Sequence, residues 1–228
     1  MKQILTICAF VFSMGISAMH HEEGEKHMDT QGDNFAYIST YTMAEGSNPA
    51  RLQKSLLANI KTLEEDGYNR CGMLRHQFGG NREFLTYCYF DSWEQFADIN
   101  DGVAATPDVK QLYGNHTDEL VAVIESNAKV APYVLQAKYS FGPYLTDNEK
   151  SANAAVLFDA YDRAFGGCNM TEHFWGPEQT WNFYCSYDSY ADFATKVEAL
   201  MVIHEEELAD KKLDILEHSD NLYTRVSR

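Results

Sequence analysis

A stretch of 27 residues occurs twice in this sequence, and the duplication constrains the fold more than any other feature. Residues 71–97 align without a gap on residues 168–194, so the two copies lie 97 residues apart. Ten of the 27 positions are identical, among them Cys71/Cys168, His76/His173, Tyr87/Tyr184 and Cys88/Cys185. This period is far longer than a solenoid unit, so we expect two copies of one small domain, at 34–128 and 129–228.

Both copies predict the same order of elements, β-α-β-β-α-β. Alternating apolar residues indicate strands, leucines at helical spacing indicate helices, and turn residues such as Asn48, Gly67 and Gly79 separate them. The first copy is expected to contain strands at 35–43, 71–78, 83–90 and 120–125, with helices at 49–66 and from 92 to about 119, interrupted at Pro107. The second copy is expected to contain strands at 133–141, 168–175, 180–187 and 213–217, with helices at 149–165 and 189–211.

The N-terminus has the pattern of a secretory signal peptide. Lys2 precedes an apolar run from Ile4 to Met14, and small residues follow up to Ala18. The run is too short to span a bilayer, so residues 1–18 are expected to be removed and to leave no membrane anchor. The sequence therefore predicts an exported protein, periplasmic or secreted.

Residues 19–33 are polar and acidic, which predicts a disordered arm. The arm contains His20, His21 and His27. Cleavage after Ala18 would place a histidine third from a free amine, a nitrogen set that suits square-planar Cu(II) or Ni(II). The alternative is a solvated leader without a ligand, and no other cofactor is expected.

Charge and cysteines limit the function further. The formal net charge of −16 disfavours nucleic acid and anionic membranes as partners. Four cysteines remain after Cys8 leaves with the signal peptide, and an even number in an exported chain suggests two disulfides. Of the three possible connectivities, the duplication favours one bridge in each copy, Cys71–Cys88 and Cys168–Cys185.

The element order is that of the ferredoxin-like α+β unit. Each half resembles a domain of the dimeric α/β barrel superfamily, which includes antibiotic-biosynthesis-monooxygenase-like proteins. The resemblance covers roughly 34–220 and rests on the element order and on the strand-to-helix junctions YCYFDSWEQFADI and YCSYDSYADFATK. It implies that the sheets of two tandem repeats, or of two subunits, pack face to face into a barrel around a ligand space.

The hairpin of each copy presents two faces, because strand side chains alternate. One face carries the cysteines and is apolar, so it should lie beneath the helices. The other face is polar and aromatic, and in a barrel it would become the lining. On it we identify candidate catalytic residues, His76, His173 and Tyr184, and candidate ligand-binding residues, Tyr87, Trp175, Asn182, Thr171 and Phe78.

His76 and His173 allow two interpretations. Facing inward, they would accept protons or bind a metal ion; alternatively, they are hydrogen-bonded framework residues retained from the duplication. His116 and His204 recur in a looser register, before Asp-Glu-Leu and Glu-Glu-Leu respectively. Haem-binding relatives in the superfamily use a helix histidine as axial ligand. The resemblance therefore implies the same role as a candidate role for His116 and His204.

Three functions are compatible with the sequence. The first is an exported barrel, a monomer or homodimer, that binds a small aromatic or apolar molecule. The second, implied by the resemblance, is a cofactor-free monooxygenase or isomerase, whose Asn, Trp, Tyr or His residues position a substrate. The third is an acidic metal-handling protein that uses its histidine-rich arm.

Overall fold

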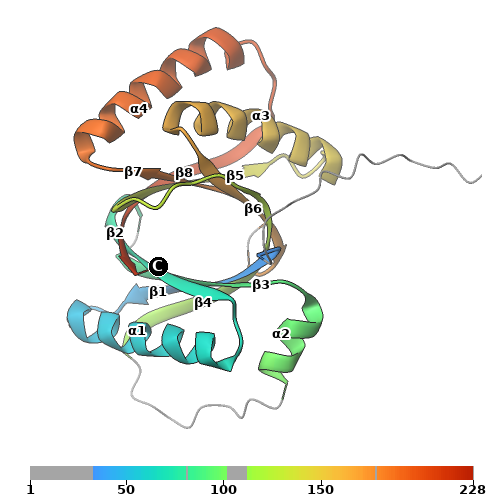
Figure 1. Ribbon diagram of the computed structural model, residues 1–228. Coiled ribbons are helices and arrows are strands. Elements are labelled where there is room, and N and C mark those ends of the chain that lie inside the picture. The colour runs from blue at the N-terminus through green and yellow to red at the C-terminus, as the bar shows by residue number, and fades with distance from the viewer. Residues whose placement is uncertain (1–32, 81, 102–111, 178, 228) are drawn as a thin grey trace, which may run out of the picture.

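Eight antiparallel strands of one chain close into a barrel, and four helices lie outside it (Figure 1). The computed structural model describes residues 33–80, 82–101, 112–177 and 179–227. The strands are β1 (Phe35–Met43), β2 (Arg70–Phe78), β3 (Glu83–Phe90), β4 (Tyr113–Ser126), β5 (Tyr133–Phe141), β6 (Cys168–Trp175), β7 (Trp181–Tyr187) and β8 (Ile215–Ser227). The helices are α1 (Pro49–Asp66), α2 (Trp93–Asn100), α3 (Asp147–Phe165) and α4 (Tyr190–Ile203), which continues into the π-helical turn η1 (His204–Leu208).

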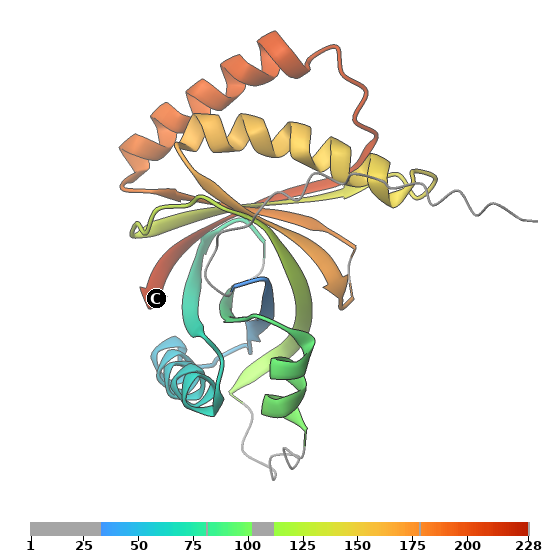
Figure 2. The same ribbon diagram turned by 45° about the vertical axis from the view of Figure 1, so that its right-hand side comes forward.

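The barrel joins two halves that have the same element order. Around the barrel the strands follow β1-β3-β2-β8-β5-β7-β6-β4, and the pairs β2–β8 and β4–β6 connect one half to the other. In Figures 1 and 2, α1 and α2 cover the outer side of the first half, and α3 and α4 cover the second. The fold is therefore α+β, as predicted, and the barrel is closed by a single chain.

Local signals explain where the helices begin and end. The side chain of Asn48 accepts a hydrogen bond from the Ala50 amide at 3.0 Å, and Pro49 occupies the first helical position of α1. Leu52, Leu56 and Ile60 form the buried face of that helix. A capping box between Thr146 and Glu149 begins α3. Because these signals are local, the sequence predicted the bounds of α1 and α3 closely.

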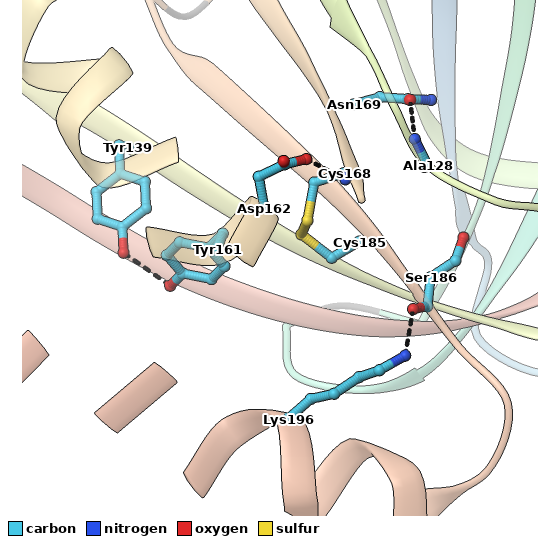
Figure 3. Close-up of a disulfide and its surroundings, with 9 residues drawn as sticks. All are labelled: Ala128, Tyr139, Tyr161, Asp162, Cys168, Asn169, Cys185, Ser186 and Lys196. Carbon is cyan, nitrogen blue, oxygen red and sulfur yellow. Dashed lines mark hydrogen bonds between the residues drawn. A yellow bond between two sulfur atoms is a disulfide. The ribbon is translucent and has the colours of Figure 1, made fainter. Parts of the chain in front are cut away.

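The two disulfides are those predicted from the duplication. In β2 and β3, Cys71 lies directly opposite Cys88, with their Cα atoms 4.1 Å apart. In β6 and β7, Cys168 lies opposite Cys185 at 4.3 Å (Figure 3). All four cysteines are buried on the outer face of the barrel, beneath the helices. Disulfides of this kind form and persist in oxidising environments.

The strands separate an outer core from an inner one. The outer side of each half packs against its own helices in one apolar cluster, which includes Met73 and Phe84 in the first half and Met170 and Phe183 in the second. The inner cluster fills the barrel and consists of Ala36, Ile38, Leu74, Leu85, Val121, Val123, Val134 and Tyr223. The expected division between a cysteine face under the helices and a second face inside the barrel therefore holds.

The last strand of each half differs from the prediction. β4 begins at Tyr113 and β8 runs from Ile215 to Ser227, whereas short strands at 120–125 and 213–217 were expected. The predicted helical segment up to about 119 is wrong, because residues 113–119 belong to β4. Polar residues on both faces at the start of each strand conceal the alternation, because these parts project beyond the core and much of their surface is exposed. Helix α4 also ends earlier than expected, and η1 follows it.

Two N-terminal predictions lie outside the described residues. The first is the signal peptide at 1–18. The second is the arm at 19–33, of which the structure describes only Asp33, so the predicted copper or nickel ligands His20, His21 and His27 also lie outside the described residues. Among the helices that the structure describes, none is both long and apolar enough to cross a membrane.

Candidate functional site

One mouth of the barrel opens into a hollow of about 500 Å³, which we call the vestibule. It lies where β2 and β6 begin and where β3, β4 and β8 end. Its lining consists of Glu64, Arg70, Cys71, Tyr87, Tyr89, Ser126, Ala128, Lys129, Val130, Asn169 and Arg225. The vestibule is therefore built from both halves of the chain.

A small inner cavity of about 50 Å³ continues from the vestibule into the barrel. Tyr87, Tyr89, Asn169 and Arg225 line both spaces, so the two spaces adjoin, and together we call them the funnel. The other residues around the inner cavity are Ala36, Ile38, Leu74, Leu85, Val123, Val134, Thr171 and Tyr184. The funnel thus narrows from a charged rim to a mostly apolar interior.

Tyr87 crosses the floor of the vestibule because strand β2 has a glycine beneath it. A Cβ atom at Gly72 would lie 2.3 Å from both Cζ and the hydroxyl oxygen of Tyr87. Any larger residue at this position would displace the ring. The Tyr87 hydroxyl accepts a hydrogen bond from Nη1 of Arg225 at 2.9 Å, which fixes the phenol at the junction of vestibule and cavity.

Arg225 is held by neutral groups. Its Nε donates to the carbonyl of Ala131 at 3.0 Å and its Nη1 donates to Tyr87. Among the residues that the structure describes, no carboxylate forms an ion pair with this half-buried guanidinium. Buried charges in proteins are usually paired, so the position favours an anionic group from outside the chain.

Arg70 and Tyr89 form the opposite rim of the vestibule. The guanidinium of Arg70 lies 4.6 Å above the ring of Tyr89, and its Nη2 is 2.6 Å from Oδ2 of Asp33. Burial is the main reason that the pKa of Tyr89 is raised, to about 12. Tyr89 is therefore a neutral hydrogen-bond donor at physiological pH.

A buried polar network lies deeper in the barrel. The amide of Gln136 donates to Oδ1 of Asn182 at 3.0 Å and to the hydroxyl of Tyr184 at 3.3 Å, and its oxygen accepts from Tyr223 at 3.1 Å. The Tyr223 hydroxyl also lies 2.6 Å from Oε1 of Glu83. Burial raises the pKa of Tyr184 and of Tyr223 above the ordinary value. These two phenols therefore stay protonated at neutral pH.

Thr171 differs from this network because its hydroxyl has no partner among the described residues. The residue is only 4% exposed and lines the inner cavity. Nearby, Oδ1 of Asn169 accepts a hydrogen bond from the Ala128 amide at 2.9 Å (Figure 3), which leaves its NH₂ group as the free end. Unsatisfied buried hydroxyls are uncommon, and this one belongs to a residue that lines the inner cavity.

The structure places the predicted residues unequally. Tyr87, Thr171 and Tyr184 line the funnel, and Asn182 belongs to the adjoining network. Phe78 and Trp175 are 61% and 74% exposed and lie outside the funnel. They stand at the far ends of β2 and β6, beyond the part of the barrel that is closed on both sides.

His76 and His173 also lie toward the far mouth, on opposite walls. Their strands, β2 and β6, are four positions apart in the eight-stranded barrel. The ring of His76 contacts Tyr223 edge to face at 5.9 Å, and burial lowers the pKa of His173. Neither histidine lines the funnel, and a ring nitrogen of each is buried without a hydrogen-bond partner among the described residues.

A second polar cluster lies on the outer face of the first half. Oδ1 of Asp118 contacts Nε2 of His116 at 2.9 Å, the Ser39 hydroxyl at 2.6 Å and the Tyr37 hydroxyl at 2.8 Å. Burial raises the pKa of Asp118, but the hydrogen bonds from these three donors outweigh it, so the pKa is lowered overall. The ring of His116 stacks on Tyr41 at 4.5 Å.

The same pairing recurs in the second half. Nε2 of His218 lies 3.2 Å from Oδ1 of Asp220, and its ring stacks on Tyr139 at 4.3 Å. The strand register makes His218, and not His204, the counterpart of His116, because Tyr41 pairs with His116 and Tyr139 pairs with His218. The shared sequence pattern is His-(Thr/Ser)-Asp-x-Leu, which a comparison at an offset of 102 would have found.

His116 and His204 do not fit the role of a haem axial ligand. His116 lies on a strand, its Nε2 is beside Asp118, and one face of its ring is covered by Tyr41. His204 begins η1, and its Nε2 is buried without a hydrogen-bond partner among the described residues. Neither nitrogen faces the funnel. In the part of the chain that the structure describes, no group of three His, Cys, Asp or Glu residues could hold a metal ion.

The sequence reasoning missed Arg225 and Tyr223, which are central to the funnel and its network. Both lie beyond the expected end of the last strand at 217. Continuing the alternation of Leu222 and Tyr223 toward Val226 would have indicated that β8 extends this far and that Arg225 points inward with Tyr223.

Solved structures with this architecture share little sequence with the chain. No family model and no curated protein matches the sequence. A candidate monooxygenase from Fusobacterium nucleatum has a TM-score of 0.59 at 7% identity, covering 86% of this chain and 93% of its own. A candidate monooxygenase from Lactobacillus acidophilus scores 0.55 at 12% identity, covering 85% and 94%. An anthrone oxidase-like protein scores 0.52 at 11% identity, covering 87% and 94%.

These likenesses extend over nearly the whole of the described chain, and at such low identity they concern the fold alone. The chain shares the overall fold of these structures, which agrees with the fold that the resemblance predicted. Within that class, this protein closes its barrel with one chain and carries a disulfide in each half.

Proposed function

We propose that this protein binds a small organic molecule in the funnel. The observation that carries the proposal is that the vestibule and the inner cavity share four lining residues, and that the inner cavity is also lined by Thr171, whose buried hydroxyl has no partner among the described residues. Aromatic walls with a few converging polar groups are typical of small-molecule sites. Tyr87 and Asn169 stand where the two spaces meet and would orient the bound molecule.

The two volumes limit the size of the ligand. An apolar cavity of about 150 Å³ accommodates benzene, so the 50 Å³ inner cavity admits only a short group of a few atoms. The vestibule, at about 500 Å³, falls within the range of ordinary ligand sites. The ligand would therefore lie mainly in the vestibule, with one end inserted past Tyr87.

The chemistry of the lining supports binding more than catalysis. Arg225, Tyr87 and Tyr89 are hydrogen-bond donors, and burial keeps the phenol of Tyr89 protonated. A general base must reach the proton that it removes, and neither His76 nor His173 lines the funnel.

Nuclear magnetic resonance of the side-chain methyl groups tests the proposal. Phenol, benzamide and benzoate serve as one-ring probes, and at least one should shift the methyl signals of Ile38, Leu74 and Val134. The variant Ala36→Leu, which fills the inner cavity, should abolish the shifts without lowering the melting temperature. If none of the probes moves these signals, or if Ala36→Leu leaves the shifts intact, the funnel is not the site.

We also propose export and an origin by duplication. The two disulfides, the apolar run before Ala18 and the repeated stretch at 71–97 and 168–194 support these proposals. The mass of protein recovered from the periplasm or medium checks the first: a chain that begins at Met19 is expected, and one that retains residues 1–18 contradicts it.

A second candidate function is oxygenation without a cofactor, at the outer cluster of the first half. His116 contacts a carboxylate whose lowered pKa keeps it ionised, an arrangement that orients an imidazole as proton acceptor. A fold neighbour is anthrone oxidase-like. An anthrone could lose a methylene proton to His116 and react with dioxygen, giving one anthraquinone and one water for each dioxygen consumed.

Dioxygen uptake with 1,8-dihydroxyanthrone as substrate tests this candidate. Quinone formation should match oxygen consumption one to one and should fall at least tenfold in His116→Gln. His218→Gln, which alters the same pattern in the other half, is the matched control and should keep the rate. A rate no higher than that of buffer would contradict the candidate.

A further inference from the structure

We infer that the ligand of the funnel is a small organic anion, and that Arg225 recognises its carboxylate. This inference rests on the proposed function and adds the chemical class of the ligand. It starts from the contrast between the charge of the whole chain and the charge of the vestibule.

The chain is strongly acidic, with a formal net charge of −16, yet the vestibule has the opposite balance. Three cationic side chains line it, from Arg70, Lys129 and Arg225, and the one carboxylate among its lining residues is Glu64. Oε1 of Glu64 accepts a hydrogen bond from the Cys71 amide at 2.8 Å, so this carboxylate is engaged with the backbone. A local excess of positive charge on an acidic protein concentrates anions at the opening.

The three cations differ in how their charge is used. Arg70 is paired with Asp33 and is 58% exposed, so water and a carboxylate already satisfy it. Lys129 is exposed, and its charge is screened by solvent. Arg225 is half-buried and has only neutral partners, the Ala131 carbonyl and the Tyr87 hydroxyl. An external carboxylate therefore gains the most binding free energy at Arg225.

The geometry also favours a carboxylate over a point charge. The planar guanidinium offers five N–H donors, and only Nε and Nη1 are used by described partners. A carboxylate suits the remaining donors because its two oxygens match the spacing of the guanidinium fork. The free NH₂ end of Asn169 lines the same junction and provides a further donor.

The ligand then has two distinct parts. Its carboxylate lies at the junction beside Arg225, and a short apolar group enters the inner cavity between Ile38, Leu74 and Val134. A monocarboxylate with a short aliphatic chain satisfies both conditions, whereas the ring of an aromatic monocarboxylate lies in the vestibule because the inner cavity is too small for it. A bulky polycyclic anion would be confined to the vestibule because the inner cavity is only about 50 Å³.

The test compares benzoate with benzamide, which has nearly the same shape and no charge. Calorimetric titration should give a dissociation constant roughly tenfold or more lower for benzoate, as expected for hydrogen bonds to a charged group. Arg225→Gln should remove this preference, so that benzoate and benzamide bind with similar affinity. Arg51→Gln, which removes an exposed arginine of α1, is the control and should preserve the preference.

Further variants and outcomes keep the inference separable from the proposed function. Arg225→Lys retains the charge and should keep part of the preference even if Arg225→Gln folds poorly, which melting temperatures would report. Equal affinity for benzoate and benzamide would overturn the anion inference while the binding function stands. Binding of neither probe would overturn both. A benzoate preference that survives Arg225→Gln would assign the recognition to another residue.

Discussion

The two walls of the barrel interior have equivalent strands but differ in chemistry at five positions. Positions that are apolar in the first half are polar in the second, as the strand register shows for Ile38/Gln136, Leu74/Thr171, Leu85/Asn182, Val121/Tyr223 and Val123/Arg225. The outer faces, in contrast, keep the disulfide and the His-x-Asp pair in both halves. The framework is thus common to the halves, whereas the interior has an apolar side and a polar side facing each other.

This difference explains why the funnel has an apolar side and a polar side although the architecture is twofold. A ligand in the funnel meets apolar Ile38 and Leu74 on one side and Thr171 and Arg225 on the other. Two identical walls would give either an apolar core or two opposed polar sites. The asymmetry also provides a way to test the account, because each half supplies the control for the other.

Removing a disulfide should have the largest effect, and the effect should be similar in the two halves. Each bridge joins cysteines 17 residues apart, so loss of either is expected to reduce the free energy of unfolding by about 3 kcal/mol. Urea denaturation of Cys71→Ala/Cys88→Ala and Cys168→Ala/Cys185→Ala measures both. Markedly unequal losses would show that the halves are not equivalent frameworks.

Replacing a residue of the polar wall by its apolar counterpart should have the next largest effect. Gln136→Ile removes hydrogen bonds to Asn182, Tyr184 and Tyr223 in a buried setting, and a loss of about 2 kcal/mol is expected. Gln179→Leu, at an exposed glutamine of the same half, is the control. If Gln136→Ile were as stable as the parent, the network would be dispensable for folding.

Gly72→Ala should damage the funnel with a smaller cost in stability. The added methyl would lie 2.3 Å from Tyr87, so the ring must move away from Arg225. Overpacking of this kind costs about 1–3 kcal/mol, and benzoate binding should weaken at least tenfold. Gly80→Ala, where the nearest atom is 3.5 Å away, should leave both properties unchanged, and equal behaviour of the two variants would contradict the placement of Tyr87.

Alkaline pH should destabilise the protein from about pH 10 upward. Burial raises the pKa of Tyr89 to about 12, and it also raises the pKa values of Tyr184 and Tyr223. The unfolded chain ionises its tyrosines near pH 10, so the stabilisation is complete below that pH and is lost as the pH rises toward the folded pKa. Urea midpoints between pH 8 and 11.5 would show this decline, and a flat profile would contradict the burial of these phenols.

A weaker effect is expected on the acid side, in the second half. Burial lowers the pKa of His204, and the nearby charge of His218 lowers it further. The unfolded chain therefore binds more protons below about pH 6.5, and stability should fall as the pH decreases from there. His204→Gln should flatten the profile between pH 5 and 7, and an unchanged slope would assign the titration to other groups such as His173.

The sequence predicted the parts of this molecule that repeat. The duplicated stretch gave both hairpins and both disulfides, and local caps such as Asn48 and Thr146 explain the positions of the helices. The last strand of each half was too short in the prediction, because polar residues at its exposed end conceal the alternation. Of the candidate site residues, Tyr87, Thr171 and Tyr184 line the funnel, whereas Phe78 and Trp175 lie outside it.

The residues that were missed are those that differ between the halves. Arg225 and Tyr223 occupy positions where the first half has Val123 and Val121, so a search for identical positions could not find them. Their importance arises from the closure of the barrel, which brings β8 beside β2 and Arg225 beside Tyr87 across 138 residues of sequence. Contacts of this range depend on the register of paired strands, which a single sequence does not determine.

A crystal structure of the protein grown with sodium benzoate would test the central claim most directly. The account predicts the benzoate carboxylate at the guanidinium of Arg225, between Tyr87 and Asn169, with the ring in the vestibule. A benzoate bound elsewhere, or an Arg225 paired with a carboxylate of its own chain, would contradict the claim that the funnel is a site for an organic anion.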